Sequence, residues 1–170
     1  MVAAEHGAGY TVMHALELEA VDVLREWLGE DSGGLKQRLE AQARDALAHL
    51  LADPARNQGV AATAVIAAGP PLPTILAQAG ASDAGLIVVG ARGSDFLRHM
   101  LLGSTASRLL RKAAGRPVLV VKQPPHETYR RLLVPIDFSA LSVHAVGFAR
   151  QLAPRAELVL MHGFDVPFEG

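Results

Sequence analysis

Hydrophobic positions along the chain fall either into short continuous runs or into helical spacing. Continuous or alternating apolar runs predict strands at residues 10–16, 60–67, 85–89, 118–121, 132–136 and 158–161. Apolar residues spaced three or four apart predict helices at residues 17–28, 35–51, 73–79, 106–112 and 140–152. Strands that alternate with helices in this way predict an α/β fold, in which a parallel sheet is covered by helices on both faces.

One loop stands out between the predicted strand at 85–89 and the helix that follows it. It reads GARGSDFLRHMLLGST, from Gly90 to Thr105. Glycines let the backbone approach an anion closely, and the first N–H groups of a helix are unpaired. Ser104 adds a hydroxyl donor beside that of Thr105. The loop therefore predicts a phosphate site, and the simpler alternative is a glycine-rich turn that only reverses the chain.

The spacing of this loop is glycine, two residues, glycine, nine residues, glycine and serine, at Gly90, Gly93, Gly103 and Ser104. It is neither the P-loop nor the GxGxxG pattern. It resembles the nucleotide loop of the universal stress protein family. The last hydroxyl residue of that family's loop falls at Ala106, which has no hydroxyl. Of the loop's charged residues, Arg92 is the best candidate to pair with phosphate.

Composition narrows the classes of function. The 16 Lys and Arg residues balance 17 Asp and Glu residues, which argues against a nucleic-acid binder. The chain has no cysteine, so disulfides and Cys-ligated zinc are excluded. No signal-peptide pattern and no apolar run of about 18 residues is found, so we expect a cytoplasmic protein without a membrane span. No catalytic constellation and no metal-ligand spacing is visible, although slow ATP hydrolysis stays open.

Two stretches of the chain resemble each other at an interval of a whole domain. Residues Thr11–Ala15 align with Val159–Gly163, with an offset of 161 − 13 = 148 residues. We therefore expect a tandem protein in three parts. Residues 1–122 form a domain that lacks its first strand and helix, 123–130 form a linker, and 131–170 form the opening strand–helix–strand of a second domain.

The second copy carries the other half of the family resemblance. Residues Tyr129–Ser139 resemble the opening strand and turn of a universal stress protein domain. The resemblance implies that Asp137 contacts the ribose, although Asp137 could also only cap the following turn. It further implies nucleoside contacts by Pro135 and Ile136, and places Ala15 near adenine. His14 and His162, at strand ends, are expected to be structural rather than catalytic.

The resemblance implies a Rossmann-like fold of the adenine nucleotide alpha hydrolase type, with five parallel strands. It implies a stress-response sensor or regulator that binds ATP, with Mg²⁺ as a candidate companion for which no dedicated carboxylate is visible. The alternative is a nucleotide-free dimerisation and protein-interaction module. Without its first strand the domain would expose unpaired edges. We expect residues 132–152 to complete the sheet of a partner in a domain-swapped homodimer, because the nine residues from Lys122 to Arg130 reach at most about 30 Å and hardly allow this within one chain.

Overall fold

The computed structural model describes residues 2–17, 32–53, 59–91, 102–113, 115–123 and 127–164. The chain divides into two compact units. The N-terminal unit comprises residues 3–124, and the C-terminal unit comprises residues 125–170 together with residues 1–2. The division into domains expected from the sequence stays a prediction, and each unit is described by itself.

Four strands form the N-terminal unit's sheets, and they pair two by two. β1 (Tyr10–Leu16) pairs in parallel with β2 (Ala62–Ala68), and β3 (Ile87–Gly90) pairs in parallel with β4 (Val118–Val121). Within the described residues, each of these strands has one hydrogen-bonded neighbour. β1 and β3 therefore each keep one unpaired edge.

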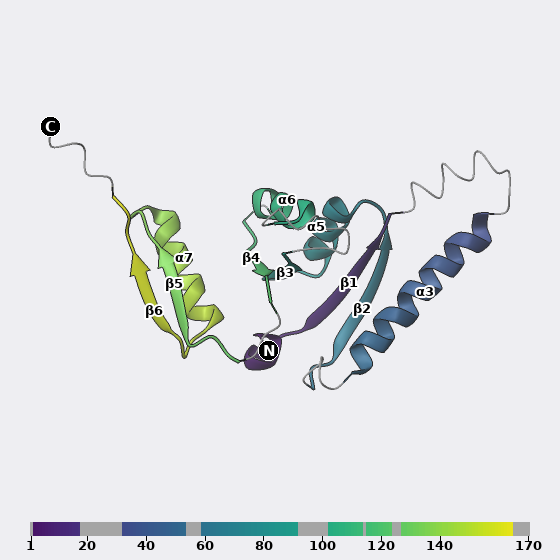
Figure 1. The fold of residues 1–170 in the computed structure, drawn as a ribbon, viewed down its shortest axis with the longest axis horizontal. Coiled ribbons are helices and arrows are strands. Elements are labelled where there is room, and N and C mark those ends of the chain that lie inside the picture. The colour runs from purple at the N-terminus through teal and green to yellow at the C-terminus, as the bar shows by residue number, and fades with distance from the viewer. Residues whose placement is uncertain are drawn as a thin grey trace. The chain divides into compact units, whose positions relative to one another are not determined.

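Helices cover these strands (Figure 1). The helices described before residue 131 are α1 (Val2–His6), α3 (Ser32–Ala52), α5 (Pro71–Ala81) and α6 (Ser104–Lys112). α3 packs along β2, whereas α5 contacts β1 and α6. The short helix α1 is not predicted from the sequence. It corresponds, through the offset of 148, to the end of the helix at residues 140–152 in the second copy.

The main core of the N-terminal unit lies between α5, α6 and one face of β3 and β4. Its buried residues are Ala79, Ile87, Leu109 and Ala113. The side chain of Val88 points to the opposite face of β3, because successive residues of a strand alternate between faces. Val88 is 55% exposed, so that face of β3 is not covered by the described helices.

The C-terminal unit is a strand–helix–strand. β5 (Arg131–Pro135) pairs in parallel with β6 (Glu157–Met161), and α7 (Ala140–Leu152) packs on β5 (Figure 1). Val134 is buried, whereas its neighbour Leu133, on the other face of β5, is 58% exposed. One face of this strand pair is thus apolar and uncovered.

The predicted α/β architecture, with parallel strands flanked by helices, is confirmed. A continuous five-stranded sheet is not observed, because the described strands form three separate pairs. None of the described strands of the N-terminal unit pairs with both β1 and β3. The predicted helix at residues 17–28 falls, except for residue 17, outside the described residues.

Both bounds of the helix predicted at residues 73–79 are wrong. α5 begins at Pro71 rather than Pro73, because proline fits the first helical positions, where its missing N–H leaves no bond unmade. It also continues through Gly80, which we expected to end it. The chain leaves the helix two residues after Ala81, where Asp83 takes a left-handed φ of 46°.

In the described part of the chain, no helix combines the length and apolar character needed to cross a bilayer. The cytoplasmic location stays a prediction.

Candidate functional site

The glycine loop starts and ends at one point of the N-terminal unit. The Ala91 N–H, next to Gly90, donates to the carbonyl oxygen of Val121 at 2.7 Å. The Gly103 N–H in turn donates to the carbonyl oxygen of Ala91 at 2.8 Å. The carboxyl end of β3 and the start of α6 are therefore held together. The predicted site residues Arg92 and Gly93 lie outside the described residues.

Helix α6 begins without a side-chain cap. Gly103 is its N-cap residue, with φ −66° and ψ 157°, and has no side chain that could accept from the first turn. The first turn carries no acidic residue, whereas Arg111 and Lys112 lie in the last turn. The N–H groups at this helix start are thus left to an external acceptor, and the helix dipole favours an anion there.

The conformation of Gly103 clarifies why a glycine is useful at this position. A φ of −66° is accessible to every residue type, so no left-handed backbone requires glycine here. What glycine contributes is the absence of a Cβ beside the helix N-terminus, which lets an anion approach the backbone.

The hydroxyl residues that follow Gly103 differ in exposure. Ser104 is exposed and Thr105 is half-buried, so both hydroxyls lie at or near the surface. Ala106 is only 2% exposed and packs inside the unit. The position that lacks the expected hydroxyl therefore serves the core, and hydroxyl donation is left to Ser104 and Thr105.

Ala15 lies near the carboxyl end of β1, where it is half-buried. The next residue, Leu16, accepts a hydrogen bond from the Gly69 N–H at 2.9 Å, which ties the end of β1 to the turn after β2. Gly69 has φ 134°, and a Cβ there would lie 3.0 Å from the Thr74 hydroxyl, so this turn requires glycine. His14 is exposed.

Asp137 organises the turn between β5 and α7. Its Oδ1 accepts from the Ser139 N–H at 3.0 Å and from the Ser142 hydroxyl. The hydroxyl of Ser139 caps α7 by accepting from the Ser142 N–H at 3.2 Å. Hydrogen bonds from the side chains of Ser139 and Ser142 and from the Ser139 N–H hold the pKa of Asp137 well below its usual range.

The capping role considered for Asp137 is therefore observed, and the ribose role stays a prediction. The two roles are compatible, because both of these bonds end on Oδ1. Oδ2 accepts neither of these two bonds.

Aromatic side chains surround the same turn, which the sequence analysis missed. The rings of Phe138 and His162 lie 4.6 Å apart between centroids, and those of His162 and Phe164 lie 6.3 Å apart. Phe138 takes a left-handed φ of 63° and is 74% exposed. An exposed, bulky residue in this conformation is unusual, and the only sequence signal is its place between Asp137 and the N-cap serine.

The backbone of Ile136 is already engaged by β6. Its N–H donates to the carbonyl oxygen of Met161 at 2.8 Å, and its own carbonyl oxygen lies 2.8 Å from Nδ1 of His162. His162 thus has a structural contact of the kind expected. Pro135, which ends β5, is exposed.

The candidate residues thus form two groups, one in each unit. In the N-terminal unit, the structure brings together the end of β3 and the start of α6, with Gly90, Gly103, Ser104 and Thr105. In the C-terminal unit it brings together Pro135, Ile136 and Asp137. Among the described residues, no cluster of three His, Asp or Glu side chains could hold a metal ion.

Known proteins resemble the chain in both sequence and fold. A sequence profile described as the universal stress protein family matches residues 1–122. A curated relative from Mycolicibacterium smegmatis (strain ATCC 700084 / mc(2)155), named Universal stress protein, is 40% identical over 85 residues. This match covers 47% of the chain and 29% of the relative, so the chain spans less than a third of that protein.

Two solved structures show the same fold. Hypothetical protein MJ0577 has a TM-score of 0.57 at 22% identity, covering 73% of this chain and 88% of that one. PA1789 from Pseudomonas aeruginosa PAO1 has a TM-score of 0.57 at 19% identity, covering 94% of this chain and 51% of that one. The second match therefore spans nearly all of this chain within about half of a longer one.

Proposed function

Because this chain belongs to the universal stress protein family, we propose that it binds ATP or another adenine nucleotide and acts as a stress-response sensor or regulator. The observation that carries this proposal is the start of α6. There the glycine spacing of the loop meets a helix N-terminus that has no side-chain cap and no acidic residue in its first turn.

The phosphates are held by the N-terminal unit. The first N–H groups of α6 point to a common position at the helix start, and the hydroxyls of Ser104 and Thr105 lie beside them. Gly90 and Gly103 keep this position free of side chains. Such a group of donors is complementary to the non-bridging oxygens of a phosphate chain.

The nucleoside is held by a carboxylate and by small or apolar residues. Asp137 is ionised at neutral pH, since even its ordinary pKa of 3.8 lies well below 7 and its hydrogen bonds lower it further, and its Oδ2 can accept from a ribose hydroxyl. Pro135, Ile136 and Ala15 supply small or apolar surface for the base. A complete site needs both halves, so nucleotide binding requires a turn like that at Asp137 to reach the glycine loop.

Mg²⁺ would bind together with the nucleotide. Since no three-carboxylate or histidine cluster lies among the described residues, the ion would be held by phosphate oxygens and water. The protein's part is then to bind the phosphates.

A nucleotide-free dimerisation and protein-interaction module is the second candidate. Two observations favour it: Ala106 lacks the hydroxyl of the family's loop, and β1 and β3 have unpaired edges that could bind another chain. The two functions differ in a simple way, since only the first requires the start of α6 to stay accessible.

Equilibrium titration with a fluorescent ATP analogue tests the proposed function. We expect saturable binding by the unmodified protein and a loss of at least about tenfold in affinity, or about 1.4 kcal/mol, for Gly103→Val. Asp137→Asn should weaken binding of ATP but leave binding of inorganic triphosphate unchanged. The matched control is Gly85→Val, before β3, where a Cβ would meet nothing within 4 Å.

The outcome for the two valine variants decides between the candidate functions. Equal affinities for Gly103→Val and Gly85→Val would place any nucleotide elsewhere than the glycine loop. Absence of saturable binding by the unmodified, nucleotide-free protein would favour the interaction module.

A further inference from the structure

Among the described strands of the N-terminal unit, β1 and β3 each have an edge to which another strand could bind. β1 pairs only with β2 and β3 only with β4 among the described strands, although α5 packs against both β1 and the core of β3. An unpaired edge leaves backbone N–H and C=O groups without partners. The exposed Val88 shows that one face of β3 also lacks a covering helix. One strand followed by one helix would supply the missing backbone partners and would also cover the exposed face of β3.

The C-terminal unit contains such a strand and helix, β5 and α7. The internal repeat identifies how β5 would pair with β1, because β6 is the second copy of β1 at an offset of 148 residues. In the C-terminal unit, Leu133 lies opposite Val159. Subtracting 148 from 159 gives Thr11, so the same register places Leu133 opposite Thr11 and Val134 opposite Val12.

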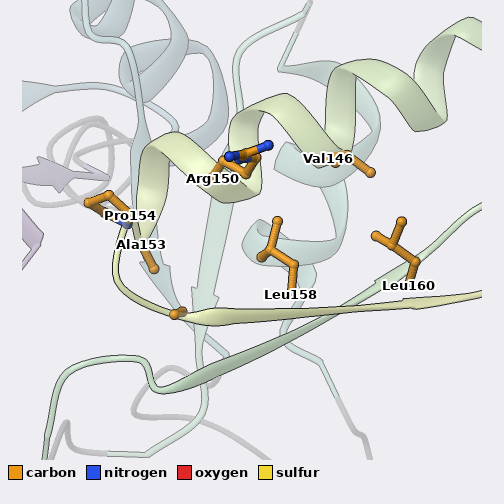
Figure 2. A pocket seen from close by; sticks show the side chains of 7 residues that line it. Val146, Arg150, Ala153, Pro154, Leu158 and Leu160 are labelled. Atoms are coloured by element: carbon orange, nitrogen blue, oxygen red, sulfur yellow. The ribbon is translucent and has the colours of Figure 1, made fainter.

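β6, the strand that pairs with β5, is loosely packed against α7. A hollow of about 390 Å³ lies between α7 and β6 and is lined by Val146, Arg150, Leu158 and Leu160 among others (Figure 2). Figure 2 shows Leu158 and Leu160 pointing toward α7 across this hollow. Leu160 remains 51% exposed. β6 is therefore held by its backbone pairing with β5 more than by side-chain packing under α7.

We infer that β1 from a second copy of this chain displaces β6 from β5, so that β5 and α7 of one copy fill the position between β1 and β3 of the other. The partner is a second copy because the chain itself carries the strand that fits, in a register that its own β5–β6 pair displays. This inference concerns assembly and does not rest on nucleotide binding.

The handedness of parallel crossovers determines which faces become covered. α7 joins β5 to β6, whose position β1 of the other copy would take, and α3 lies between β1 and β2 in the chain. Right-handed crossovers in the same direction across the sheet place α7 on the face of α3. The connections through α5 and α6 cross in the opposite direction and cover the other face. α7 would then cover Val88, and the exposed Leu133 would turn toward α5. Both exposed apolar side chains become buried.

One side-chain contact opposes the exchange. Arg131 and Glu157 form an ion pair at 2.8 Å across the first residues of β5 and β6. The counterpart of Glu157 in β1 is Gly9, by the same offset, which offers no carboxylate. Both side chains of the pair are largely exposed, so the ion pair contributes little to holding β6.

Engineered disulfides test the exchange. Because the chain has no native cysteine, only the introduced cysteines can form disulfides. A Thr11→Cys chain is mixed with a Leu133→Cys chain, without nucleotide, and oxidised mildly. We expect a covalent dimer on a non-reducing gel as the main product. The off-register mixture of Val12→Cys with Leu133→Cys is the control, because Val12 lies on the opposite face of β1 and should give little dimer.

Two further variants complete the test. Adding Glu157→Ala to the Leu133→Cys chain should leave the yield of dimer unchanged or raise it only slightly, since the exposed ion pair that it removes contributes little to holding β6. A Leu133→Cys and Val159→Cys double variant that closes fully within one chain, with no dimer from the Thr11→Cys mixture, would overturn the inference. So would a Thr11→Cys and Leu133→Cys double variant that closes within a single chain, because the second copy would then be unnecessary.

Discussion

At the scale of residues, Asp137 has one observed role and one proposed role. Its Oδ1 stabilises the turn into α7 through Ser139 and Ser142, and Oδ2 is the atom we assign to the ribose. The hydrogen bonds that make the turn favour the charged carboxylate and lower the pKa of Asp137 further below neutral pH.

This arrangement predicts a pH dependence for the variant Asp137→Asn. Folding lowers the pKa of Asp137 below its ordinary value of 3.8, so its stabilisation is complete above that pH and is lost as pH falls through the folded-state pKa. Asp137→Asn should therefore be less stable than the unmodified protein at neutral pH. The difference should shrink as the pH falls below 3.8.

Urea unfolding of both proteins at a series of pH values measures this difference. Other titrating groups are common to the two proteins, so their effects largely cancel. A stability difference that stays constant from neutral to strongly acidic pH would show that the ionised form of Asp137 contributes nothing to folding.

At the scale of elements, α6 joins the core to the candidate phosphate site. Its residue Leu109 is fully buried against Ala79, Ile87 and Ala113, whereas the adjacent Leu110 is 52% exposed. The two leucines share a helix and have similar helix propensity. They differ in burial, which makes them a matched pair.

Leu109→Ala should therefore lower the free energy of unfolding by about 3 kcal/mol, through lost burial and the cavity left behind. Leu110→Ala should change it by less than about 1 kcal/mol. The midpoints and slopes of urea unfolding report both values. Similar losses for the two variants would contradict the position of α6 in the core.

Most elements are predictable from the sequence because parallel, buried strands read as continuous apolar runs. The range of α7 is predicted correctly, since Ser139 provides a clear N-cap signal before it. The bounds of α5 are not, because a helix begins readily at a proline and tolerates an interior glycine such as Gly80 when its packing is favourable. Tertiary contacts decide such boundaries.

At the scale of the whole molecule, two pieces that resemble parts of the family's domain lie in different units, the glycine loop in the N-terminal unit and the Asp137 turn in the C-terminal unit. The sequence predicts which pieces these are, because the glycine loop and the Asp137 turn each have a recognisable pattern. The partner of β5 is not predictable in this way. β6 pairs with β5 in the structure, and β1, which resembles β6 in sequence, is the strand that we propose replaces it.

The central claim is that the start of α6 binds a nucleotide, and thermal unfolding with and without Mg-ATP tests it most directly. At 100 times its Kd, the ligand should stabilise the protein by about 2.7 kcal/mol, which raises Tm by roughly 5–10 °C for a chain of this size. The rise should vanish in Gly103→Val and persist in Gly85→Val. No rise at millimolar ATP, in unmodified protein free of co-purified nucleotide, would contradict the account.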